Sequence, residues 1–294
     1  MGLRGGPGRL MPGLAEIRRL VGAYLPGRGT GSVAEIGAGL DNVAYEVDGE
    51  LIVRFARTPD PARTEREARL LSAVAARSPV PVPAPVFVAA ELGCIAYRKL
   101  PGTPLIDQPR GDATAVAATL GELLTALHTV PIGHWAGLAD ADDQPMTEWL
   151  RDAAEEYAAV ADRVPVHRER IEAFLGSPPP DRGSDLVFSH NDLGIEHVLV
   201  TDEATVSGVI DWSDAALVDP AYDFGLILRD LGPAALDTAL GGYPAHGNLR
   251  ERARFYARCT VLEDLAYGLE TGLERYRAKS IDALDWLYPL RSHP

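Results

Sequence analysis

Apolar positions in the first third of the chain follow helical spacing once and strand-like runs several times. The spacing over 14–25 predicts a short amphipathic helix, which Pro26-Gly27 ends. Apolar runs at 33–36, 43–47 and 51–55 predict three strands in succession. A Gly-rich turn separates the first two runs, and the hairpin signal Asp-Gly separates the second and third. This part of the chain is therefore expected to form an antiparallel sheet.

The pattern changes after about residue 100 from mainly strands to mainly helices. A helix over 65–76, a stiff Pro-rich segment and two more strands, 86–89 and 95–100, complete the β-rich part. Helical spacing then dominates, and it predicts helices over 112–129, 146–162, 166–175, 221–231, 233–240, 249–275 and 280–288.

This order predicts an α+β chain with two lobes. Residues 1–13, rich in Gly, are expected to be a flexible leader. Residues 14–100 would form a small N-terminal lobe and residues 101–294 a large, mainly helical lobe, with Pro101-Gly102 at the boundary.

A hairpin with a carboxylate at either end interrupts the helical part. The apolar run 186–188 leads into His190-Asn191-Asp192, and the strands 198–200 and 206–210 lead into Asp211. A carboxylate at the end of a buried strand is costly to desolvate unless a cation or hydrogen-bond donors accompany it. Asp192 and Asp211 are therefore candidate site residues, with turn residues of a β-meander as the alternative.

The stretch HNDLGIEHVLV, followed by GVIDW and DPAYDFG, resembles the antibiotic phosphotransferases, namely the aminoglycoside kinases and their macrolide branch. The resemblance extends over about residues 30–290, and its specific part is the segment around Asp192 and Asp211. It implies a two-lobed, protein-kinase-like fold. It also implies an O-phosphotransferase that uses ATP or GTP.

In this family the first aspartate accepts or orients the attacking hydroxyl, which assigns that role to Asp192, and the second holds Mg²⁺, which assigns that role to Asp211. The further metal ligand comes five residues after the first aspartate, where this chain has His197 and most aminoglycoside kinases have Asn. The macrolide branch is similar to this chain in carrying His. Because imidazole is a softer ligand than oxygen, Mn²⁺ is possible beside Mg²⁺.

The resemblance also implies nucleotide-binding positions in the small lobe. Gly39 lies in the turn that would cover the phosphates, and Arg54 stands where the fold places a phosphate-holding cation. Glu67 would pair with that cation, with Glu65 as the alternative. The backbone groups of Arg98 and Leu100 would bond the adenine.

Supporting and acceptor roles complete the expected site. By resemblance, His190 and Asp223 would brace the catalytic loop. Glu196 is expected to be a solvated turn residue, with a rival metal ligand as the alternative, because in an extended segment its side chain would point away from that of His197. Glu263 and Asp264, together with the acidic side of helix 146–162, are candidate contacts for amino groups on the acceptor, with solvated helix faces as the alternative.

Composition narrows the class of protein. The 294 residues include 42 acidic and 28 basic side chains, a net charge of −14, which argues against nucleic acid as a partner and suits a cationic small molecule. The two cysteines lack metal-ligand spacing, and no apolar run reaches transmembrane length. A cytoplasmic protein without membrane partners is the expectation.

The sequence therefore predicts a kinase that phosphorylates a hydroxyl of a small molecule, most readily an aminoglycoside or macrolide antibiotic. A metabolic kinase of the choline or homoserine type is the alternative enzyme. A catalytically inactive nucleotide-binding module is the alternative of another class. Nucleotide-dependent turnover separates the enzymes from the module, and a substrate panel separates the enzymes from each other.

Overall fold

The computed structural model describes residues 11–27, 31–39, 41–108, 112–183, 185–244 and 247–290. The chain divides into two compact units, a small unit of residues 1–77 and 81–100 and a large unit of residues 78–80 and 101–294. Of the expected leader, residues 1–10 lie outside the described ranges, while Met11 packs against the apolar core of the small unit. No helix in the described ranges is both long and apolar enough to span a membrane.

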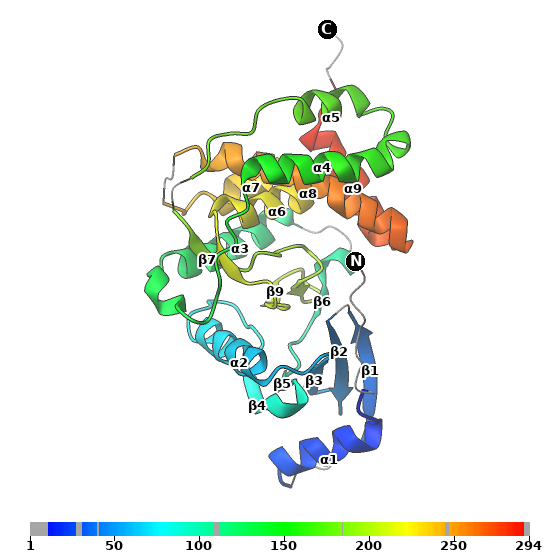
Figure 1. Cartoon of the computed structure of the whole chain (residues 1–294), viewed down its shortest axis with the longest axis vertical. Helices are drawn as coiled ribbons and strands as arrows, with labels where there is room; N and C mark the ends of the chain where they lie inside the picture. The colour runs from blue at the N-terminus through cyan, green and yellow to red at the C-terminus, as the bar shows by residue number, and fades with distance from the viewer. Residues whose placement is uncertain are drawn as a thin grey trace, which may run out of the picture. The chain divides into compact units, whose positions relative to one another are not determined.

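The small unit is built on a five-stranded antiparallel sheet of order β1-β2-β3-β5-β4 (Figure 1). Its strands are β1 (Val33–Ala38), β2 (Asn42–Val47), β3 (Leu51–Ala56), β4 (Pro85–Ala89) and β5 (Cys94–Arg98). Each lies where the apolar runs predict a strand. The expected antiparallel sheet is therefore confirmed.

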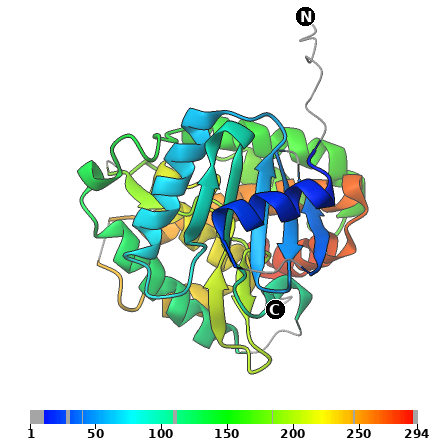
Figure 2. The same ribbon diagram turned by 90° about the horizontal axis from the view of Figure 1, so that it is seen from below.

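One face of this sheet is closed by α1 (Leu14–Tyr24), which crosses the strands in Figure 2. Ile17 and Val21 of α1 are fully buried and share one apolar cluster with Val53 and Phe55 of β3. Because successive side chains of a strand point to opposite faces, Arg54 lies on the face away from α1. The sheet thus separates an apolar core from the face that carries Arg54.

The helix α2 (Pro61–Ala75) begins four residues before the predicted start at 65. Asp60 caps it by accepting a hydrogen bond from the Arg63 amide at 3.1 Å, and Pro61 occupies the first helical position, where its missing N–H costs nothing. The early start was missed because the apolar periodicity begins only inside the helix.

The large unit contains seven α-helices in its described part: α3 (Ala113–His128), α4 (Met146–Val160), α5 (Arg168–Leu175), α6 (Ala221–Leu231), α7 (Pro233–Ala239), α8 (Leu249–Thr271) and α9 (Glu274–Leu287). Two small sheets accompany them, β10-β7 and β6-β8-β9. Their strands are β6 (Thr103–Pro104), β7 (Val187–Ser189), β8 (Val198–Val200), β9 (Val206–Val209) and β10 (Ala216–Val218).

The long helix α8 forms the centre of the helical part, because α4, α6 and α9 all pack against it. Buried residues occur around most of its circumference, as expected of a helix covered on several sides. Gly272 adopts the left-handed conformation and ends α8, so the predicted helix 249–275 is too long by four residues. The helix α9 accordingly begins six residues before the predicted 280.

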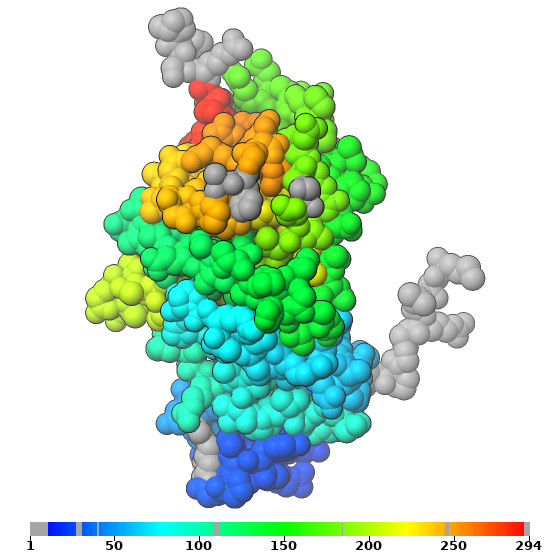
Figure 3. Space-filling view, turned by 90° about the vertical axis from the view of Figure 1, so that its left-hand side faces the viewer, coloured from blue at the N-terminus to red at the C-terminus, as the bar shows by residue number. Residues whose placement is uncertain are grey.

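Two glycines allow a direct test of helix packing. The helices α3 and α7 pack against each other, and Figure 3 shows the yellow part of the chain bordering on the green part. Gly121 of α3 lies at this contact, close to Ala239 of α7. A Cβ at this position would approach the carbonyl oxygen of Ala239 to 2.4 Å. We therefore expect Gly121→Ala to lower the free energy of unfolding by about 1–3 kcal/mol, measured by urea denaturation.

Gly22 of α1 is the matched control, because a Cβ there would meet no atom within 4 Å. Gly22→Ala is expected to stabilise the chain by up to about 1 kcal/mol, since alanine is the better helix former. Equal stability of Gly121→Ala and wild type would contradict the close approach of α3 and α7.

Candidate active site

The catalytic-loop segment runs from the end of β7 to the start of β8, and Asp211 follows β9 on the neighbouring strand. Asn191 and Asp211 both have left-handed backbone conformations, with φ of 63° and 61°. Such conformations are unfavourable for residues other than glycine, although Asn and Asp tolerate them best. One of these residues precedes Asp192 and the other is Asp211 itself, so both predicted aspartates lie at sharp bends of the backbone.

His197 lies between the two aspartates. Its Nδ1 is 2.8 Å from the backbone carbonyl oxygen of Asp192 and 3.4 Å from the Asp192 carboxylate. Because a carbonyl oxygen only accepts, Nδ1 carries the proton, and in the neutral ring Nε2 presents a lone pair. Nε2 is 3.9 Å from the Asp211 carboxylate. The structure thus brings together the three residues predicted for base and metal binding.

The carboxylate of Asp192 is electrostatically unusual. Desolvation in the site raises the pKa of Asp192 to about 7, with Glu196 adding to the shift and His197 opposing it. A general base is most effective when its pKa lies near the working pH. The Asp192 side chain nevertheless keeps 41% of its surface exposed, so a hydroxyl group can reach it.

His190 connects the catalytic loop to the strand that leads to Asp211. Its side chain is fully buried, and Nε2 donates a hydrogen bond of 2.9 Å to the carbonyl oxygen of Ile210. Burial and the neighbouring His197 lower the pKa of His190 to about 4, so the ring is neutral at physiological pH. The position fits the bracing role expected for His190.

Asp223, at the start of α6, contacts the beginning of the catalytic loop, at Ser189 and Asn191. Its fully buried carboxylate accepts hydrogen bonds from the Ser189 hydroxyl and from the Asn191 amide, the latter at 3.1 Å. Ser189 accepts in turn from His128 Nε2 at 2.9 Å. These contacts fix the residues before Asp192 and fit the expected brace. Ser189 and His128 had no predicted role in it.

The donor set fits a divalent cation. Ligand atoms of Asp192, Glu196 and His197 lie within 4.8 Å of one another, and Asp211 faces the free nitrogen of His197. Mg²⁺ prefers carboxylate oxygens as ligands, and a set that includes one imidazole nitrogen can also bind Mn²⁺. Asp211 and His197 would hold such an ion beside Asp192, and the ion would neutralise phosphate charge.

Glu196 lies in a turn, as expected, but the expectation that its side chain is solvated is wrong. Its side chain is only 11% exposed, and its carboxylate lies 2.9 Å from the ammonium group of Lys279 on α9. Residues 195–197 form a turn rather than an extended segment, so the side chains of Glu196 and His197 do not alternate to opposite sides.

The two acidic residues predicted for the acceptor differ in their surroundings. Glu263 is exposed on α8 and has no ion-pair partner in the described part of the chain. Asp264 is 14% exposed and lies 3.1 Å from Arg229 and 2.9 Å from Lys279. Because two buried cations already neutralise Asp264, only Glu263 is kept as a candidate acceptor contact.

In the small unit, Arg54 of β3 forms an ion pair with Glu67 of α2, and both side chains are mostly buried. Glu67, rather than Glu65, is thus the partner of Arg54. Gly39 lies in the turn between β1 and β2, where its carbonyl oxygen accepts a hydrogen bond of 2.9 Å from Arg57. These contacts place a buried cation on the sheet face opposite α1.

The backbone of Arg98 and Leu100, predicted to bond the adenine, lies at the end of β5. The amide of Lys99 bonds the Glu50 carbonyl oxygen at 2.8 Å, so hydrogen bonding to β3 continues through Lys99. Backbone groups alternate in direction along a strand, and those of Arg98 and Leu100 therefore point away from β3. The pairing of β5 with β4 ends at Tyr97, so β4 does not cover the backbone of Arg98 and Leu100 on the side away from β3.

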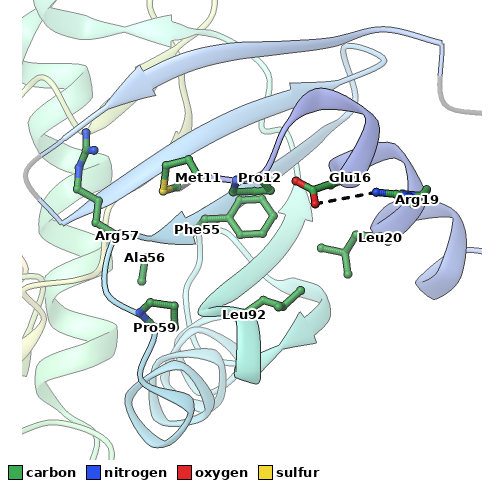
Figure 4. Close-up of a pocket in the computed structure, with 10 residues that line it drawn as sticks. All are labelled: Met11, Pro12, Glu16, Arg19, Leu20, Phe55, Ala56, Arg57, Pro59 and Leu92. Atoms are coloured by element: carbon green, nitrogen blue, oxygen red, sulfur yellow. Dashed lines mark ion pairs between the residues drawn. The ribbon is translucent and has the colours of Figure 1, made fainter. Parts of the chain in front are cut away.

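The small unit also has a hollow of about 480 Å³, which lies away from the predicted nucleotide-binding residues. Figure 4 shows its lining by α1, β3 and the neighbouring loops, with Phe55 and Leu20 on its apolar side. Phe55 points to the face opposite Arg54. The hollow therefore lies on the α1 side of the sheet, and none of the five predicted nucleotide-binding residues lines it.

Comparison with known proteins places the chain in a family. The model of the phosphotransferase enzyme family matches residues 32–256, which is most of the chain. Viomycin phosphotransferase of Streptomyces vinaceus is 27% identical over 290 residues, covering 90% of this chain and 96% of the relative.

Two solved structures show the same fold. A macrolide 2′-phosphotransferase from Brachybacterium faecium is 27% identical, with a TM-score of 0.63 and coverage of 95% of this chain and 100% of that one. The GDP complex of aminoglycoside 2′-phosphotransferase-IIIa is 19% identical, with a TM-score of 0.66 and coverage of 93% and 98%. The expected α+β, protein-kinase-like fold is confirmed. The chain therefore belongs to the phosphotransferase enzyme family and is a small-molecule kinase related to the antibiotic phosphotransferases.

Proposed function

We propose that this enzyme transfers the terminal phosphoryl group of ATP or GTP to a hydroxyl group of an antibiotic and thereby inactivates it. The observation that carries the proposal is the convergence of Asp192, after β7, with His197, before β8, and Asp211, after β9. This is the arrangement of base and metal ligands that phosphoryl transfer needs.

In this mechanism Asp192 accepts the proton of the attacking hydroxyl through a carboxylate oxygen. His190 and Asp223 hold the loop, so that the carboxylate does not have to reorganise during the reaction. Arg54, kept in place by Glu67, would neutralise the phosphates. A divalent ion held by Asp211 and His197 would offset the remaining phosphate charge.

A basic acceptor is favoured by the charge around α4 and α8, which pack against each other. Glu263 is exposed, but partial desolvation by the surrounding protein raises its pKa, and the nearby carboxylates of Asp264, Glu156 and Asp152 raise it further. Carboxylates gathered in this way are stabilised by amino groups. We therefore rank an acceptor with several amino groups, such as an aminoglycoside, above one with few.

A macrolide is the second candidate acceptor. It is favoured by the histidine at position 197 and by the 27% identity to the macrolide 2′-phosphotransferase. The acidic surroundings of Glu263 do not exclude it, because one amino group can pair with one carboxylate.

The deciding experiment is a nucleotide-consumption assay with ATP and with GTP. The panel contains kanamycin, viomycin, a macrolide, choline and homoserine, and mass spectrometry identifies the product. Antibiotic-dependent consumption with one added phosphoryl group supports the proposal. Turnover with choline or homoserine alone would identify a metabolic kinase, and nucleotide binding without turnover would identify an inactive module.

Replacement of Glu263 tests the acceptor site. Glu263→Gln is expected to raise the KM of a polyamine acceptor about fivefold, as loss of one exposed charge pair does, and to leave the nucleotide KM unchanged. Glu270→Gln, an exposed change on the same helix, is the control. A rise in the nucleotide KM alone would place the acceptor elsewhere.

Replacement of His197 tests the metal ligand. His197→Ala is expected to lose most activity, and His197→Asn to retain much of it with Mg²⁺, because an amide supplies a hard oxygen. Mn²⁺ should support the wild type at least as well as Mg²⁺, and the Asn variant should shift towards Mg²⁺. His134→Ala, at an exposed position, is the control. An active Ala variant with unchanged metal dependence would show that His197 only packs.

A further inference from the structure

A cluster of buried charges lies directly behind the catalytic loop. We call it the ion cluster, and its members are Glu196, Arg229, Asp230, Asp264 and Lys279. Each of these side chains is at most 14% exposed. Buried charges are retained only when they are paired, and a cluster of three carboxylates and two cations is a costly structure to maintain. Such a cost calls for a function.

Lys279 is the centre of the cluster. Its ammonium group lies 2.9 Å from the carboxylate of Glu196, 2.9 Å from that of Asp264 and 3.4 Å from that of Asp230. An ammonium group has three donors, so one group can serve three carboxylates. Arg229 completes the pairing through Asp230, at 2.8 Å, and Asp264, at 3.1 Å.

Two of these contacts reach the catalytic loop itself. The Asp230 carboxylate accepts a hydrogen bond of 3.1 Å from the backbone amide of Ile195, and Lys279 holds the side chain of Glu196. Both residues stand between Asp192 and His197 in the chain. The turn that sets the distance between base and metal ligand is thus fastened to α6 and α9.

The contact to Lys279 also restrains Glu196. The Glu196 carboxylate lies within 4.8 Å of the ligand atoms of Asp192 and His197, close enough to compete with them for a cation. An ion pair with the buried ammonium group opposes such movement, because releasing Glu196 would leave Lys279 with one carboxylate fewer.

We propose that Lys279 is a positioning residue of this kinase, which acts through Glu196 and Asp230 to fix the turn between Asp192 and His197. The expected effect on kcat rests on the proposed function, whereas the expected effect on hydrogen exchange in the turn does not. Displacement of a reacting group by about 1 Å can reduce the rate about a hundredfold, so a loosened turn affects kcat before it affects nucleotide binding.

The sharpest test is Glu196→Gln, because it reduces the ion pair with Lys279 to at most a neutral hydrogen bond and leaves the contact of Asp230 with the Ile195 amide in place. Two cations then face two carboxylates, and the variant is expected to fold with a Tm near that of the wild type. We expect kcat to fall at least tenfold, with nucleotide and acceptor KM within about twofold. The Ile195 amide should exchange its hydrogen faster, measured by mass spectrometry of peptides from 186–200.

Replacement of Lys279 tests the centre of the cluster. Lys279→Met leaves three carboxylates with one cation and is expected to lower both Tm and kcat, whereas Lys279→Arg should restore Tm and part of kcat. The kcat of the double variant Glu196→Gln, Lys279→Met should be no lower than that of Lys279→Met alone. Both changes act on the same contact, the ion pair between Glu196 and Lys279. Arg277→Met is the control, because its ion pair with Glu274 on the same helix is exposed.

Several outcomes would overturn the proposal. One is a Glu196→Gln variant with wild-type kcat and unchanged exchange at Ile195. Another is a double variant in which the fold-losses of kcat from Glu196→Gln and Lys279→Met multiply, as they do for independent residues. A third is a raised Mn²⁺ requirement in Glu196→Gln, which would make Glu196 a metal ligand instead. If the wild type phosphorylates no acceptor, the proposed function fails, but hydrogen exchange at Ile195 still tests whether Lys279 and Glu196 hold the turn.

Discussion

Asp192→Ala is expected to lower kcat by about 10²–10⁴-fold, the range that loss of a general base produces. The nucleotide Kd should stay within about twofold, because the base acts on the acceptor hydroxyl and contributes little to ground-state binding. The environment supports this role, since desolvation raises the pKa of Asp192 to about 7 while its carboxylate remains accessible. Steady-state kinetics and calorimetric titration with nucleotide measure the two quantities.

Asp202→Ala provides the matched control, because Asp202 is an exposed aspartate in the turn between β8 and β9. This variant should behave like the wild type in both measurements. Wild-type turnover of Asp192→Ala would remove Asp192 from the mechanism. Equal loss of nucleotide affinity in Asp192→Ala would instead point to a role in metal binding.

Asp211→Asn is expected to raise the Kd of the metal–nucleotide complex at least tenfold, about 1.4 kcal/mol. The change removes one negative charge from the ligand set, and asparagine tolerates the left-handed backbone at this position, where φ is 61°. Alanine would add backbone strain and confuse the result. Without metal, in the presence of a chelator, variant and wild type should bind nucleotide equally.

The Ser213 hydroxyl, which donates to the Asp211 carboxylate at 2.6 Å, gives a graded version of this experiment. Ser213→Ala should weaken metal–nucleotide binding less than Asp211→Asn. An Asp211→Asn variant with wild-type affinity in Mg²⁺ would exclude Asp211 as a ligand.

The secondary structure was predictable where periodicity extends over many residues. The strands of the small unit and the helices α3, α4 and α6 lie where the apolar spacing places them. The strands β6 and β10 were not predicted, because segments of two and three residues are too short to carry a period. The equally short β7 and β8 were predicted as apolar runs on either side of the Asp192 motif. The early start of α2 depends on one capping side chain, Asp60, rather than on apolar spacing.

The site was predictable to the extent that its residues are close in sequence. Asp192 and His197 lie in the loop before the hairpin of β8 and β9, Asp211 lies directly after it, and the structure brings the three together. The pairing of Arg54 with Glu67 was expected only from family resemblance, because nothing in the two segments specifies their contact. The assignment of Glu196 as solvated failed because it assumed an extended backbone in a segment that turns.

The ion cluster was missed although the sequence carries a signal for it. Lys279 stands four and eight residues before Ala283 and Leu287, so it belongs to the buried stripe of α9. Arg229 and Asp230 likewise interrupt the apolar run at the end of α6. A charged residue on a buried stripe needs an opposite charge elsewhere, but periodicity does not say which one.

The contact between Glu196 and Lys279 joins residues that are 83 positions apart. During synthesis, the catalytic motif leaves the ribosome well before its lysine partner does. Loop closure over such a separation is slow compared with formation of the local hairpin. The hairpin can therefore form early in a nascent chain, but the kinase becomes competent only after α9 has been made and docked. Shortened versions that end before α9 would contain the whole catalytic motif and still be inactive.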